Sequence, residues 1–136
     1  MLPMIKPKKS NKLTKAEIQE RIGYFTKRVF YWQQELGFLE VQMRVTAQDN
    51  HDTRASWFPD VSAGQISIHY SNHWIKDYKV FLEDIDRTAF HEVYESQFHK
   101  IQYYLLEVAS TRIVSELLHI MTRRAENTIF PKLRGY

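Results

Sequence analysis

The amino-acid sequence predicts an α+β fold with one N-terminal helix, a small three-stranded sheet and two C-terminal helices. Apolar residues recur at helical spacing near the start of the chain and again in its second half, whereas alternating apolar and polar residues occur only between these segments. Because helices and strands do not alternate along the chain, the pattern favours an α+β domain over a βαβ arrangement. A length of 136 residues suits a single domain.

The basic charge is concentrated at the start of the chain, where residues 1–15 contain five lysines and no acidic residue. Subtracting these five from the 19 basic side chains leaves 14 against 16 acidic ones, a net charge of −2 for the other 121 residues. We interpret residues 1–13 as a flexible Lys-rich arm and residues 14–136 as one domain. The arm is expected to be a solubilising terminus or to make weak contact with nucleic-acid phosphates.

Cysteine is absent, which excludes disulfides and thiolate metal ligands, so any metal must be held by His, Asp or Glu. No apolar run approaches the roughly 20 residues needed to span a bilayer. Residues 1–5 are too short for the core of a signal peptide. We therefore expect a cytoplasmic protein with no membrane partner.

The first predicted helix covers residues 14–36. Thr14 and Glu17 have the spacing of a capping box, apolar residues at helical spacing follow, and Gly37 supplies the stop. Strands are then expected at residues 39–47, at about 53–58 before a break at Pro59, and at 65–70. These three strands are interpreted as a meander lying on the first helix, followed by an irregular connection at residues 71–82.

The second predicted helix begins near three acidic residues, Glu83, Asp84 and Asp86, which the dipole of a helix N-terminus favours. It is expected to run to about residue 108. A third helix is expected from about residue 110 to a point before Pro131, with an apolar side formed by residues 113, 114, 117, 118 and 121.

The second helix carries the residues that point to chemistry. His91 and Glu95 are one turn apart, as a two-ligand metal site requires, and both fall at the rim of the apolar stripe. In the HExxH motif, two histidines hold zinc and the intervening glutamate is a general base. Here the pattern is HExxE, with Glu92 in the position of the base and a carboxylate as second ligand.

A third ligand must come from another element, and the third helix offers Glu116 and His119. His119 would restore a set of two histidines and one glutamate, which is known in catalytic zinc sites. On a helical wheel, however, His119 points away from the apolar side, and Glu116 lies nearer its edge. Both alternatives stay open on the pattern alone. His51, His69, His73 and His99 are expected to be ordinary polar residues.

The sequence after the arm resembles a family of small phage-encoded metallopeptidases that are distantly similar to SprT-like zinc proteases. Four stretches carry the resemblance: residues 31–45 with Trp32 and Gly37, residues 52–60 with Trp57 and Asp60, residues 88–93, and His119 with residues 123–127. The resemblance implies a minimal zincin-like domain in a phage or prophage protein acting inside a bacterium. It also implies His91 as a zinc ligand, Glu92 as the general base, and a role for His119.

We therefore expect a zinc-dependent metallopeptidase with His91, Glu95 and His119 as ligands, Glu92 as base and a protein or peptide as substrate. The strand ending near Tyr70 is expected to align the substrate through its backbone. The chain departs from the resemblance at Glu95, where proteases of this type more often have histidine. The alternative is a catalytically inactive relative that binds a host or phage protein, or nucleic acid through the arm.

Overall fold

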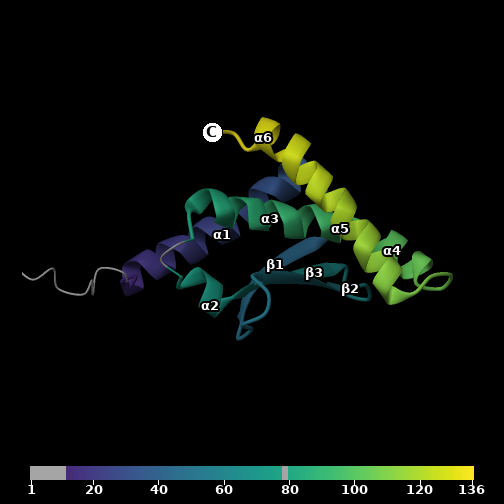
Figure 1. The fold of residues 1–136 in the computed structure, drawn as a ribbon, viewed down its shortest axis with the longest axis horizontal. Helices are drawn as coiled ribbons and strands as arrows, with labels where there is room; N and C mark the ends of the chain where they lie inside the picture. The colour runs from purple at the N-terminus through teal and green to yellow at the C-terminus, as the bar shows by residue number, and fades with distance from the viewer. Residues whose placement is uncertain (1–11, 78–79) are drawn as a thin grey trace, which may run out of the picture.

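The computed structural model describes residues 12–77 and 80–136, so most of the predicted arm lies outside the described part of the chain. The elements follow the predicted α+β order, with an N-terminal helix, a three-stranded sheet and C-terminal helices (Figure 1). In chain order they are α1 (Lys15–Glu35), β1 (Gln42–Gln48), β2 (Ala55–Asp60), β3 (Gln65–Ser71), α2 (Asn72–Ile75), α3 (Leu82–Ser96), α4 (His99–Leu105), α5 (Thr111–Thr128) and α6 (Phe130–Leu133).

The strand order is β1-β3-β2, so the predicted meander is wrong. β1 pairs with β3 in parallel, and β2 pairs with β3 antiparallel. β3 contributes Ile66, Ile68 and Tyr70 to the core from alternate positions, as predicted, and this most buried strand occupies the centre. β2 is left at an edge of the sheet, where Pro59 is tolerated within the strand instead of ending it.

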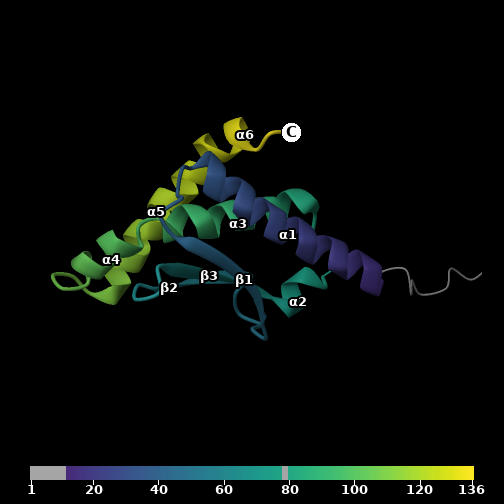
Figure 2. The same ribbon diagram turned by 180° about the vertical axis from the view of Figure 1, so that it is seen from behind.

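The helices α1, α3 and α5 lie on one side of the sheet in both ribbon views (Figures 1 and 2). α1 and α3 pack side by side against the sheet, and α5 crosses α3. The core between these layers is aromatic and aliphatic. Its largest fully buried side chains include Phe25, Trp32, Ile66, Ile68, Phe90 and Phe130. Within the described residues, no helix is both long and apolar enough to cross a membrane.

Helix α1 begins and ends as the sequence predicts. The Thr14 hydroxyl accepts from the backbone N–H of Glu17, and the Glu17 carboxylate accepts from the backbone N–H of Thr14, both at 3.1 Å. Gly37 adopts a φ of 67° just after the C-cap, a conformation that glycine reaches without steric penalty. Capping chemistry alone therefore located both ends of this helix within one or two residues.

The predicted second helix is divided into α3 and α4 by a break at residues 97–98. The Ser96 hydroxyl donates to the Val93 carbonyl at 2.9 Å, and His99 Nδ1 lies 3.0 Å from the Ser96 carbonyl. Such side-chain bonds compete with the regular helical ladder. The helix predicted to run to about residue 108 consequently does not continue along the core, and Ile101 and Val108 are exposed.

Two further corrections concern the connections. Residues 71–82, predicted to be irregular, contain the short helix α2, whose first turn is capped by the Ser71 hydroxyl. The last helix does end before Pro131, but Pro131 then lies in the first turn of α6. Proline is well accommodated there because the first N–H groups of a helix have no intrahelical acceptor.

A buried ion pair fixes α3 against α1. Asp86, predicted to serve only the helix dipole, is fully buried. Its Oδ1 accepts from Arg28 Nε and from Trp32 Nε1, each at 2.7 Å. Arg28 also donates to the Arg134 carbonyl at 2.5 Å, which brings the C-terminal segment into the same network. The Arg28 side chain of α1 therefore joins α3 and the C-terminal segment, two segments that are distant from it in sequence.

Replacing this carboxylate should strongly destabilise the fold. Asp86→Asn is expected to lower the free energy of unfolding by about 3–5 kcal/mol, because it leaves Arg28 as a buried and uncompensated charge. The exposed pair of Glu83 with Arg134 (3.0 Å) supplies a matched control on the same helix. Glu83→Gln should change the free energy of unfolding by less than about 1 kcal/mol. Urea titration measures the free energy of unfolding of both variants. Equal losses in the two variants would contradict the central role of Asp86.

Candidate metal centre

The structure brings His91, Glu95 and His119 together. His91 and Glu95 project from successive turns of α3, and His119 comes from α5, which crosses α3. One ligand atom from each residue lies within 4.8 Å of the other two. These are the three ligand positions predicted from the sequence, although nothing in the sequence placed α5 against this part of α3.

The three side chains converge on one carboxylate oxygen. Glu95 Oε2 lies 3.0 Å from His119 Nδ1 and 3.4 Å from His91 Nε2. Ligand atoms about 2.0–2.1 Å from a tetrahedral zinc ion are separated from one another by about 3.3 Å. The two observed separations are therefore close to the distance between neighbouring ligand atoms in a tetrahedral zinc site.

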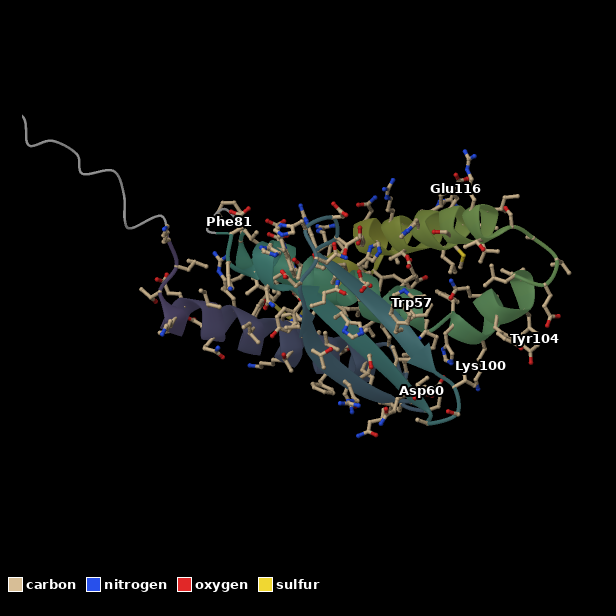
Figure 3. All side chains as sticks on the ribbon, turned by 90° about the horizontal axis from the view of Figure 1, so that it is seen from below. Trp57, Asp60, Phe81, Lys100, Tyr104 and Glu116 are labelled. Atoms are coloured by element: carbon tan, nitrogen blue, oxygen red, sulfur yellow. The ribbon has the colours of Figure 1, made fainter. Side chains whose placement is uncertain are left out.

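Glu95 is positioned by the sheet as well as by the helices. Trp57 Nε1–H on β2 donates to Glu95 Oε1 at 3.0 Å. The Thr122 hydroxyl lies 3.3 Å from Glu95 Oε2 but closer, at 2.7 Å, to the Leu118 carbonyl, which is its principal acceptor. Figure 3 shows Trp57 at the edge of the sheet on the side where α4 and α5 lie. The two carboxylate oxygens thus have separate tasks, one facing Trp57 and the other facing the histidines.

Glu126 is a site residue to which the sequence analysis gave no role. Its Oε1 lies 2.7 Å from His91 Nδ1, on the opposite side of the imidazole from Glu95. A carboxylate that accepts from Nδ1–H leaves Nε2 facing the ligand cluster and holds the ring in one orientation. The sequence could have indicated Glu126 through its spacing. Glu126 follows His119 by two helical turns and therefore shares a face of α5 with it.

Glu92 lies beside the cluster and is only 6% exposed. It lines a cavity of about 430 Å³ together with His91, Glu95, His119, Thr53 and residues 55–59 of β2. A second cavity of about 390 Å³ shares His91 and Glu92 and is also lined by Glu126 and by arginines 54, 87 and 123. Glu92 therefore borders both spaces next to the candidate centre.

Mutual interactions shift the pKa values of the cluster. Burial by itself lowers the pKa of His91, but the hydrogen bonds to Glu126 and Glu95 outweigh it and raise this pKa to about 10. Burial raises the pKa of the Glu92 carboxyl to about 8, assisted by the charges of Glu95 and Glu126 and opposed by that of His91. For Glu95, burial is outweighed by hydrogen bonds from His91 and Trp57, so its pKa is lowered.

The rotation of α5 brings His119, and not Glu116, to the cluster. Glu116 is exposed, pairs with Arg112 at 3.3 Å and lies on the side of α5 that faces away from the sheet (Figure 3). The helical-wheel preference for Glu116 assumed that residues 113, 117 and 121 were buried, and this assumption was wrong, because all three are exposed. The buried residues of α5 are 114, 118, 122 and 125. The face that they form is rotated by about 60° from the predicted apolar side, in the direction of His119.

The donor set fits zinc. It consists of two imidazoles and one carboxylate, a combination found in catalytic zinc sites. Glu92, Glu95 and Glu126 place three carboxyl groups around His91, and their ionised forms could balance the charge of a divalent cation. The cavity on one side of the cluster leaves room for a fourth ligand.

Comparison of the chain with protein-family models, with curated proteins and with solved structures gave no significant match.

Metal-free protein should lose stability as the pH rises from 6.5 to 10. The folded pKa of His91 exceeds its value of 6.5 in an unfolded chain, so its stabilising contribution is complete below pH 6.5 and is lost as the pH passes about 10. Glu92 acts in the same direction, because its folded pKa of about 8 lies above its ordinary value of 4.5. Thermal unfolding of chelator-treated protein across this range measures the effect.

The double variant His91→Gln and Glu92→Gln serves as the control for this prediction, because it removes both titrating groups. Its melting temperature should vary less with pH than that of the wild type. The same pH dependence in both proteins would contradict the assignment.

Proposed function

We propose that this chain is a zinc-dependent metallopeptidase whose metal ligands are His91, Glu95 and His119 and whose general base is Glu92. The observation that carries the proposal is the convergence of three ligand atoms within 4.8 Å, next to a buried carboxyl group at the wall of a cavity. A zinc ion at this position supplies a Lewis acid that polarises a carbonyl group and makes water more acidic. The resemblance to small phage metallopeptidases supports the same reading.

In this proposal Glu92 accepts the proton of the attacking water and later transfers it to the leaving amine. Its pKa of about 8 describes metal-free protein, and a divalent cation nearby favours the ionised form that a base requires. Glu126 keeps His91 Nε2 directed at the metal position through its bond to Nδ1. Glu95 stands where histidine is more usual, so the centre contains a buried carboxylate. Trp57 and His119 stabilise this carboxylate by contacting its two oxygens.

The expected alignment of substrate on the strand ending near Tyr70 is revised. β3 is paired on both sides along its length, so its backbone groups are already used. Among the described strands β2 pairs only with β3, and it lines the cavity at the candidate centre with residues 55–59. We therefore propose that an extended peptide adds to the outer edge of β2, where backbone hydrogen bonding gives affinity with little dependence on sequence.

Replacing Glu92 separates catalysis from metal binding. Glu92→Gln should retain one zinc per chain at the candidate centre and lower the rate of peptide hydrolysis by at least about 100-fold, the contribution expected of a general base. Zinc content by atomic emission and cleavage of an unstructured protein such as casein measure the two properties. Hydrolysis at the wild-type rate would reassign the base.

The third ligand is tested by a matched pair on α5. His119→Ala should weaken zinc binding at the candidate centre, whereas Glu116→Ala should leave it unchanged, because Glu116 pairs with Arg112 outside the cluster. Glu126→Gln should lower the affinity by about 10–100-fold with every ligand still present, since it loosens the orientation of His91. Calorimetric titration with zinc measures all three, and a larger effect of Glu116→Ala than of His119→Ala would sink the assignment.

A catalytically inactive binding protein is the second candidate. Helix α5 exposes several large apolar side chains, which suits contact with a protein partner. They are Ile113, Leu117, Ile120 and Met121. This candidate would be favoured if the chain bound zinc through His91 but cleaved no peptide, and if Glu92→Gln left the zinc binding unchanged. The nucleic-acid version depends on the Lys-rich arm, most of which lies outside the described residues.

A further inference from the structure

A second cluster of metal-binding side chains lies beside α2 and shares no residue with the first. Asp49 and His51 belong to the loop after β1, and His73 belongs to α2. His73 Nε2 contacts Asp49 Oδ1, and the imidazole rings of His51 and His73 are stacked with their centroids 3.4 Å apart. One ligand atom from each of the three residues lies within 4.8 Å of the others, as in the first cluster.

The backbone around this cluster is held in place by a single buried serine. The Ser71 hydroxyl donates to the Asn50 carbonyl, and the Ser71 N–H donates to the Arg54 carbonyl at 2.8 Å. The same hydroxyl accepts from Trp74 N–H and so begins the helix that carries His73. Within the loop, Asn50 Oδ1 accepts from the N–H of Asp52 at 2.8 Å. The loop and α2 are therefore fixed relative to each other before any ligand binds.

We propose that Asp49, His51 and His73 form a second metal site, which takes a first-row transition ion such as Zn²⁺. Two imidazole nitrogens and one carboxylate oxygen suit zinc and its neighbours, whereas Mg²⁺ and Ca²⁺ prefer sites built from oxygen. The three side chains are exposed, and a cavity of about 380 Å³ lined by both histidines leaves room for water to complete the coordination. This inference does not rest on the proposed peptidase activity.

The second site has a structural consequence for the first. Its loop leads directly into β2, and Thr53 and Arg54 in that loop line the two cavities at the candidate centre. An ion shared by the loop and α2 ties the start of this edge strand to the end of β3. Metal at the second site therefore stabilises one wall of the first site without contributing a ligand to it.

Zinc titration of the full-length, chelator-treated chain tests the proposal. Wild type should take up two equivalents, His73→Ala one and His91→Ala one, and the His73→Ala His91→Ala double variant none. His69→Ala is the matched control, because His69 bonds to Thr46 at 2.8 Å and lies outside both clusters. It should keep two equivalents. Zinc should also raise the melting temperature of His91→Ala but not that of the double variant, since only the former keeps a site in the folded state.

The two sites fail in different ways. One equivalent in wild type that His91→Ala loses and His73→Ala keeps would overturn the second site and leave the first intact. One equivalent that His73→Ala loses and His91→Ala keeps would support the second site and count against the proposed peptidase centre. Uptake that is the same in wild type and His73→Ala overturns the second site whatever its stoichiometry.

Discussion

Helix α3 is held at both ends by buried carboxylates, and the rest of the structure depends on satisfying them. A buried carboxylate is stable only when donors or opposite charges surround it. Asp86, in the first turns of α3, obtains its donors from Arg28 and Trp32 of α1. Glu95, in the last turn, obtains a donor from Trp57 of β2 and contacts His119 of α5. These bonds tie the helix to α1 at one end and to the sheet and α5 at the other, so its rotation is fixed.

In this arrangement Glu95 Oε2 faces both histidines, whereas Oε1 accepts from Trp57. In metal-free protein, a protonated His91 between Glu95 and Glu126 supplies the positive charge that the carboxylates require. A metal ion at the candidate centre would take over that role, so protons and metal compete for the cluster. A glutamate at the fifth position of the motif is therefore compatible with the fold, because its surroundings already stabilise a negative charge.

Local chemistry accounts for the features that could be predicted. The capping box at Thr14 located the start of α1, and Gly37 located its end. The alternation through Ile66 and Ile68 identified the buried face of β3. The strand order was not predictable in the same way, because alternation identifies a strand but not its neighbour. The break after Ser96 was missed because it results from competing side-chain bonds in an otherwise helical pattern.

The sequence by itself determined that His91, Glu92 and Glu95 lie on adjacent faces of one helix, because their spacing fixes their relative directions whatever the helix packs against. The absence of cysteine also excluded thiolate metal ligands. Only the tertiary structure brought His119, and not Glu116, next to Glu95, brought Glu126 to His91, and left β2 at the edge of the sheet beside the centre. These features depend on how α5 rotates as it packs and on which strand occupies the middle of the sheet, and both are set by burial across the whole core.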